Sequence, residues 1–398
     1  MATTYRPQRT EGRQTIHRPV ANFRRNPASP FRHVDLVLVG CVALVSMFGA
    51  LMVYSATRGP GPTYDSTFGK KVLLFIGVGG TLMAAVALLD YRKLRDYWPF
   101  VYGGCLVLLI GVLVPGLGSR VAGTQGWYQL GPFQLQPSEL AKLGLIIGFS
   151  GLASQFRGDL DARRVLVLLV MCGLPMGLVM LQPDLGTTLV SVALSFALLL
   201  VAGVRPRILG LLAVLAIVVT TLVLTSGVLG NYQKARLTTY IDQDRPASQV
   251  TRTNQKAAYN LDQAKLAIGS GGVWGKGLFH GPQTRLSNVP AQQTDFIFTA
   301  VGEQVGFVGS GALLAVLAAI VWRVWRAAQL ARDDFGTLIC TGVMVMLIVQ
   351  IFENVGMTMG IMPITGIPLP FVSYGGSALL TMFLSIGLVL SVHMRRFS

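Results

Sequence analysis

The sequence predicts an all-α polytopic membrane protein with ten transmembrane helices and one large extracytoplasmic loop. Hydrophobic residues make up 52% of the 398 residues and charged residues only 13%, whereas soluble domains average about 25% charged residues. Apolar runs of roughly 18 to 24 residues recur along the chain, and runs of that length can cross a bilayer as helices. Composition and repetition therefore point to the same fold class.

Ten spanning helices are predicted, at about 35–56, 71–90, 98–116, 138–155, 164–182, 186–203, 206–228, 298–322, 337–360 and 375–393. They divide the chain into four parts. Residues 1–33 hold seven Arg and few large apolar residues, which is typical of a disordered tail. Residues 34–229 carry helices one to seven, 230–297 form the extracytoplasmic loop, and 298–398 carry the last three helices and a short C-terminus.

The placement of Lys and Arg predicts the orientation. With the N-terminus inside, the cytoplasmic segments hold 20 Lys and Arg, whereas the short outer loops hold four. Positive charge is retained on the cytoplasmic side of membrane proteins, so both termini are expected to be cytoplasmic. The net charge of +16 is largely explained by this topology, which argues against a nucleic-acid partner.

The Cys and His residues give no sign of a metal or redox site. The four Cys all lie inside apolar runs, where packing thiols are expected rather than a disulfide or a metal set. The four His are scattered along the chain. A zinc site or a Ser-His-Asp triad is therefore not expected.

Polar motifs gather at the starts of four helices that the topology places on the outer face. They are Gly123–Lys142, Leu181–Thr187, Thr294–Phe296 and Met362–Ser377. Helix N-termini present backbone amide donors and favour anions. Four separate stretches on one membrane face predict a single site there, for an anionic ligand.

Asp295 is the first candidate in this group. It is either the N-terminal cap of the helix that follows or a general base at the outer surface. Glu303 lies about 80° further around the same helix, at 100° per residue, and would be within the membrane region. Glu353 and Asn354 lie deep in another helix, and such residues need partners there.

Among the other candidates, the Glu139–Lys142 pair and Arg236 also have two readings each. Glu139 and Lys142 are spaced i, i+3 and form either an internal ion pair or a polar floor in which Lys142 meets an anionic headgroup. Asp184 is most simply an N-cap. Arg236 is a solvated charge or a phosphate contact.

The long loop has a pattern of its own. Residues 254–268 place their Ala, Leu and Ile side chains mainly on one side, which predicts an amphipathic helix lying in the membrane interface. The Gly-rich stretch 269–277 is expected to be a flexible loop. It has neither Walker-type spacing nor a preceding strand, so a nucleotide cradle is not expected.

Taken together, these motifs resemble the SEDS family (shape, elongation, division and sporulation proteins) over about residues 34–394. Each block is weak evidence alone, but six in the same order are specific. The similar blocks are Trp127–Lys142, Leu181–Thr187, the stretch around Arg236, Ala267–Gly272, Thr294–Phe298 and Ser373–Ser377. Within the family, Gly356–Pro370 is more similar to RodA, of cell elongation, than to FtsW, of division, in which Lys usually occurs near Thr365.

The resemblance implies a peptidoglycan glycosyltransferase that polymerises lipid II by inverting transfer at the outer face of the bacterial cytoplasmic membrane. It implies a class B penicillin-binding protein (a transpeptidase) and the elongation machinery as partners. No organic cofactor is implied, and a divalent cation (Mg or Mn) is left open. By motif match Asp295 is the essential carboxylate, and the substrate-binding residues are Glu139, Lys142, Asp184, Arg236, Gln136 and Ser373.

Two departures from the family pattern and two rival functions remain. The family usually has Glu where this chain has Ala291, which makes a metal role for that position doubtful, and it often has Ser where this chain has Ala264.

The rival functions are a lipid II flippase or other transporter and a non-enzymatic membrane scaffold for the transpeptidase. A transporter needs polar groups leading to both faces, whereas these motifs crowd the outer one.

Overall fold

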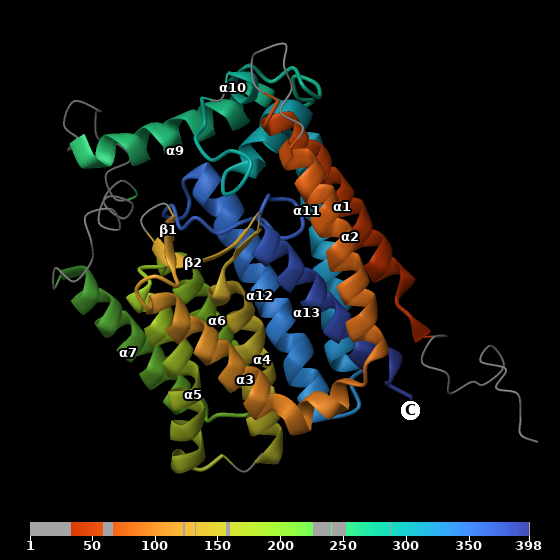
Figure 1. Ribbon diagram of the computed structural model, residues 1–398, viewed down its shortest axis with the longest axis vertical. Helices are drawn as coiled ribbons and strands as arrows, with labels where there is room; N and C mark the ends of the chain where they lie inside the picture. The colour runs from red at the N-terminus through yellow and green to blue at the C-terminus, as the bar shows by residue number, and fades with distance from the viewer. Residues whose placement is uncertain are drawn as a thin grey trace, which may run out of the picture.

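The protein is described by a computed structural model covering residues 33–58, 67–121, 124–131, 133–156, 160–225, 240, 252–286 and 288–397. It is mostly helical (Figure 1), which confirms the predicted fold class. The tail before residue 33, much of the long loop, and Arg236 lie outside the described residues.

Each predicted span coincides with a helix of the described chain. The long helices are α1 Leu36–Ala56, α2 Thr67–Leu88, α3 Tyr91–Leu113, α4 Pro137–Gln155, α5 Ala162–Leu181, α6 Leu185–Val201, α7 Pro206–Thr225, α9 Arg252–Gly271, α11 Ile297–Gln329, α12 Asp334–Met359 and α13 Gly376–Met394, and α10 Pro282–Arg285 is short. Among the described residues, seven helices are long and apolar enough to cross a membrane: α1, α2, α3, α5, α11, α12 and α13. This makes the chain a multi-pass membrane protein. The count of ten spans stays a prediction, because α4, α6 and α7 do not meet those criteria.

Two helix boundaries differ from the predicted ones. Helix α3 begins at Tyr91 rather than near residue 98, because the Asp90 side chain accepts the backbone N–H of Arg92 and caps it there. Helix α11 continues to Gln329, beyond the predicted end at 322. In both places a helix continues past the apolar run into basic residues, where hydropathy no longer marks it.

A small antiparallel sheet was not predicted. Strands β1 (Ser119–Val121), β2 (Thr124–Leu130) and β3 (Phe133–Leu135) pair in that order, and β2 meets β3 across a turn at Gly131, where φ is +63°. Strands β1 and β3 have three residues each, which is too short to show a period-2 pattern. They lead the chain from α3 into the start of α4.

Helices α12 and α13 occupy the centre of the bundle. Helices α1, α2 and α11 lie on one side and α3 to α7 on the other (Figure 1). Helix α1 touches the backbone of the α12–α13 connection at Gly49, where an added Cβ would lie 2.6 Å from the Phe371 carbonyl oxygen. This close approach holds that connection, which carries part of the candidate site, against the bundle.

Helix α9 lies across one end of the bundle (Figure 1) and buries Leu261, Ala264 and Ala267 against the loop before α11 and the end of α12. The segment after α9 is hydrogen-bonded to α11 rather than flexible. Helix α11 is broken at Gly306, where φ is +68°, and the carbonyls of Glu303 and Gln304 accept the N–H groups of Lys276 and Gly277 at 2.9 and 3.0 Å. The break frees the carbonyls that this segment uses.

Replacing Gly306 by Ala is expected to destabilise the protein by more than about 2 kcal/mol, because the backbone is left-handed there and the new Cβ would clash with the Gly275 backbone nitrogen. Thermal unfolding of the detergent-solubilised protein measures this. Gly311→Ala is the control, since a Cβ at Gly311 meets nothing within 4 Å. Equal unfolding temperatures for the two variants would contradict the expectation.

Candidate active site

The starts of α4, α6, α11 and α13 supply the polar residues of one end of the bundle. Helix α4 begins with Pro137 at its first turn, where the missing N–H costs nothing. The backbone N–H of Gln136 donates to the Ser377 hydroxyl at 2.9 Å, and that hydroxyl donates to the Gln134 carbonyl at 3.0 Å. Ser377 of α13 thereby fixes the strand that leads into α4.

Glu139 and Lys142 form an ion pair inside the protein. The Lys142 Nζ lies 2.8 Å from the Glu139 Oε1, and both side chains are almost fully buried. The i, i+3 spacing produces this contact, as the ion-pair reading predicted. The second oxygen, Glu139 Oε2, has no hydrogen-bond partner among the described residues, so the pair retains an acceptor for a further group.

Asp184 caps α6, as predicted, and also reaches α4. Its Oδ1 accepts the Thr187 N–H at 3.0 Å and its Oδ2 accepts the Thr187 hydroxyl at 2.8 Å. The same Oδ2 accepts the Gln136 side-chain amide at 3.3 Å and faces the Ser138 hydroxyl at 3.5 Å. Two of the predicted substrate-binding residues, Gln136 and Asp184, are therefore in direct contact.

Asp295 lies in a tight turn just before α11. The N-cap of α11 is Phe296, so the cap reading of Asp295 is wrong by one residue. One residue of this turn, Ala291, has a left-handed backbone conformation, with a φ of +52°. The Asn354 side-chain amide donates to the Asp295 carbonyl oxygen at 2.7 Å and to the Ile367 carbonyl at 2.8 Å. The buried Asn354 thus ties the turn that carries Asp295 to the α12–α13 connection.

Ser373 lies in this connection and is buried. Its hydroxyl accepts the Leu369 N–H at 2.8 Å, and the next residue, Tyr374, donates its N–H to the Gln293 carbonyl at 2.9 Å. The Ser373 hydroxyl holds the local turn, and Tyr374 gives a second link to the Asp295 turn. A contact of Ser373 with substrate stays a prediction.

Glu353 joins the two groups of residues. It is buried on α12 next to Asn354, and its carboxylate oxygens make no hydrogen bond of regular geometry among the described residues, although the Thr365 side chain interacts with them. Lys142 and Asp184 are the charged groups that act on it electrostatically. Adjacent residues of one helix therefore face the α4–α6 group and the Asp295 turn.

No metal cage is formed by the protein alone in the described part of the chain, since no three His, Cys, Asp or Glu side chains lie close enough to share an ion. Among the described residues, acceptor oxygens without a regular hydrogen bond are nevertheless present: one each at Glu139 and Asn354, and both carboxylate oxygens of Glu353. Such a site could supply one or two oxygen ligands, and the remainder would come from a phosphate-bearing substrate and water.

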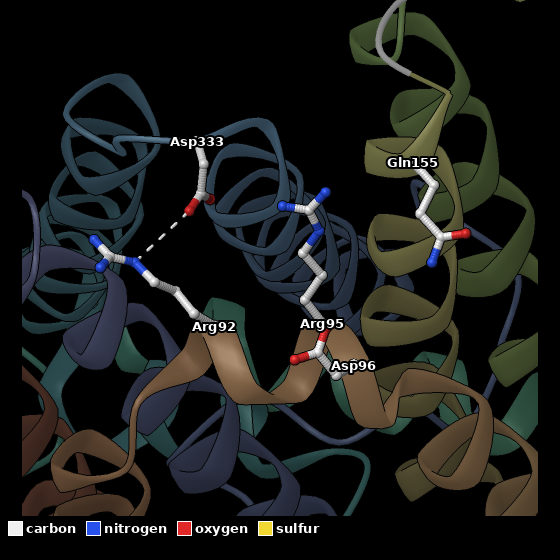
Figure 2. A pocket seen from close by; sticks show the side chains of 5 residues that line it. All are labelled: Arg92, Arg95, Asp96, Gln155 and Asp333. Carbon is white, nitrogen blue, oxygen red and sulfur yellow. Dashed lines mark ion pairs between the residues drawn. The ribbon is translucent and has the colours of Figure 1, made fainter.

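A separate pocket lies at the far end of α4, about 27 Å from Pro137 at 1.5 Å per residue. Figure 2 shows its lining residues around a cavity of about 390 Å³: Arg92, Arg95, Asp96, Gln155 and Asp333. Asp333 accepts the Tyr91 hydroxyl at 2.9 Å and caps α12 by accepting the Gly336 N–H at 2.7 Å. These contacts join α3 to α12. The pocket is separate from the candidate site, because it lies at the opposite end of α4.

The sequence matches a known family along nearly its whole length. The family model, FtsW/RodA/SpoVE, described as "Cell cycle protein", covers residues 35–397. The chain belongs to this family. The predicted resemblance is thereby confirmed.

Several FtsW/RodA/SpoVE relatives align with almost all of the chain. The peptidoglycan glycosyltransferase MrdB of Escherichia coli K12 is 33% identical over 365 residues, which is 92% of this chain and 94% of that protein. Stage V sporulation protein E of Bacillus subtilis is 33% identical over 376 residues, 90% and 96% of the two chains.

Solved structures of the FtsW/RodA/SpoVE type agree with the fold. The rod shape determining protein RodA of Thermus thermophilus superposes with a TM-score of 0.66 at 30% identity, covering 92% of this chain and 98% of that one. A chain of a peptidoglycan synthase complex that coordinates polymerization and crosslinking superposes with a TM-score of 0.77 at 30% identity, covering 92% and 99%.

For this FtsW/RodA/SpoVE member, sequence reasoning missed the residues that hold the site together. Asn354 was expected only to need partners, and Ser377 was not singled out for a role of its own. A neutral amide or hydroxyl between loops has no periodic signal. The available signal was an Asn inside an apolar helix, which is costly without partners.

Proposed function

We infer that this FtsW/RodA/SpoVE member is a peptidoglycan glycosyltransferase, and we propose that it polymerises lipid II at the outer face of the bacterial cytoplasmic membrane. The relatives named glycosyltransferases align with 92% to 94% of the chain. The observation that carries the proposal is the cluster of the buried Glu139–Lys142 pair and the half-buried Asp184, joined through α12 to the turn of Asp295.

The chemistry requires one inverting displacement. In the donor, a sugar carbon is α-linked to a polyprenyl pyrophosphate. The 4-hydroxyl oxygen of the acceptor sugar attacks that carbon, the new β-1,4 bond forms, and the carbon–oxygen bond to the pyrophosphate breaks with its electron pair. The hydroxyl proton must pass to a base, and the leaving pyrophosphate must meet positive charge.

We assign Asp295 as the base that takes the 4-hydroxyl proton, because it lies in the turn at the start of α11. Lys142 is assigned to the pyrophosphate, with its charge held in place by Glu139. Gln136, Asp184 and Ser373 would line the substrate cavity, and Arg236, outside the described residues, would contact phosphate. A divalent cation, Mg or Mn, would neutralise pyrophosphate charge when bound, with Glu139 or Glu353 as ligands.

Orientation and partners complete the proposal. The distribution of Lys and Arg supports cytoplasmic N- and C-termini. The likeness to a chain of a peptidoglycan synthase complex supports a class B penicillin-binding protein as the crosslinking partner. Similarity to a rod shape determining protein supports a role in elongation, within the machinery of that process.

Polymerisation in detergent tests the enzyme function against transport. The full chain, co-purified with its transpeptidase partner, is expected to convert purified lipid II into glycan strands, detected by gel electrophoresis. A transporter would yield no glycan strands, because translocation forms no glycosidic bond. EDTA is expected to stop the reaction and added Mg²⁺ or Mn²⁺ to restore it. Absence of polymer from a well-folded complex would exclude the proposed function, and full activity in EDTA would exclude the cation.

A further inference from the structure

A second set of buried contacts, separate from the Asn354 contact, reaches the Asp295 turn. Glu303, six residues into α11, has no exposed surface. Its Oε1 accepts the Gln283 N–H at 2.7 Å, and its Oε2 accepts the Thr284 N–H at 2.8 Å and the Thr284 hydroxyl at 2.5 Å. A fully buried carboxylate inside a membrane protein is costly unless it is paired in this way.

The contacts continue from Glu303 to the Asp295 turn. The Gln292 side-chain amide donates to the Thr284 hydroxyl at 3.2 Å and to the Thr299 hydroxyl at 3.1 Å. The Thr299 hydroxyl in turn donates to the Phe296 carbonyl at 2.7 Å. Gln292 and Phe296 flank Asp295 in the chain, so the network holds the turn before Asp295 through the Gln292 side chain and after it through the Phe296 backbone carbonyl.

We propose that Glu303 is a positioning residue of the transferase, which acts through Thr284 and Gln292 to fix the Asp295 carboxylate for proton transfer. This inference rests on the proposed function. The Thr284 hydroxyl is the connecting atom, because it donates to Glu303 and accepts from Gln292. Removing it breaks the link while the two backbone N–H groups of Gln283 and Thr284 still cap Glu303.

The test therefore replaces Thr284 by Val, which removes the hydroxyl and keeps the shape of the side chain. Lipid II polymerisation by the full chain with its transpeptidase partner is measured over a range of lipid II concentrations. We expect kcat to fall about 10- to 100-fold, since misplacement of a catalytic group by about 1 Å has effects of that size. KM should not change, because only the transition state uses the position of the base.

Three further variants complete the design. Thr284→Ser keeps the hydroxyl and is expected to retain near wild-type kcat. Gln292→Met breaks the same link from the other side and leaves Thr284 bonded to Glu303, so it should reproduce the kcat loss. Ser270→Ala is the matched control, because the Ser270 hydroxyl donates only to the Ala267 carbonyl of its own helix.

The outcomes separate positioning from simple stability. A kcat loss in Thr284→Val and Gln292→Met at unchanged thermal stability, with rescue by Thr284→Ser, supports the proposal. Wild-type kcat in both, or losses that only follow lower unfolding temperatures, overturns it. An inactive wild-type complex instead overturns the proposed function, which keeps the two failures distinguishable.

Discussion

Asp295→Asn is expected to reduce glycan-strand formation by about 10²- to 10⁴-fold, the contribution of a well-placed general base. Asn has the same shape as Asp but cannot accept the 4-hydroxyl proton. The contact that places the turn uses the Asp295 backbone carbonyl, which receives the Asn354 amide at 2.7 Å. The substitution leaves that carbonyl in place, so the fold should survive.

Strand length and rate from purified lipid II measure this effect in the complex with the transpeptidase. Asp262→Asn is the matched control, because it removes the same charge from an exposed position on α9 and should not change the rate. Thermal unfolding of both variants checks that the protein is intact. A folded Asp295→Asn protein that polymerises at the wild-type rate would show that the base is another residue.

Lys142→Met is expected to reduce both stability and activity. It leaves Glu139 as a buried charge without its partner at 2.8 Å. Breaking a buried pair in this way costs about 3–5 kcal/mol in the free energy of unfolding. Polymerisation should be lost as well, because the pyrophosphate loses its positive partner.

The double variant Lys142→Met/Glu139→Gln separates these two effects. With both charges gone, the desolvation cost disappears and most of the stability should return. Activity should not return if Lys142 contacts the pyrophosphate. Recovery of both stability and polymerisation would mean that the pair is structural only. Lys93→Met, at an exposed position near the start of α3, is the control for removal of a Lys charge.

The parts of the structure that could be predicted from the sequence are those encoded by local spacing. Apolar runs predicted the helices, the i, i+3 spacing predicted the Glu139–Lys142 pair, and an Asp before Leu-Gly-Thr predicted the cap at Asp184. Each contact involves residues within one turn of a helix, so a short stretch of sequence contains it.

The contacts that assemble the candidate site are long-range and could not be predicted. The Asn354 amide reaches a carbonyl 59 residues earlier in the chain, and Glu303 accepts donors 19 and 20 residues earlier. Glu303 was expected to lie within the membrane region, but its partners are on α10 and depend on how that helix folds back onto α11. Tertiary packing decides these contacts.

Helix α12 links two parts of the candidate site mechanically. Glu353 and Asn354 point about 100° apart on a rod that rises 1.5 Å per residue. Glu353 faces the charges of α4 and α6, whereas Asn354 holds the turn before α11. Glu353 and Asn354 lie within one helical turn, which moves as a rigid body. Any axial shift or rotation of α12 therefore moves both side chains together. The positions of the Asp295 turn and of the Glu353 carboxylate are thus tied to the axial register of one central helix.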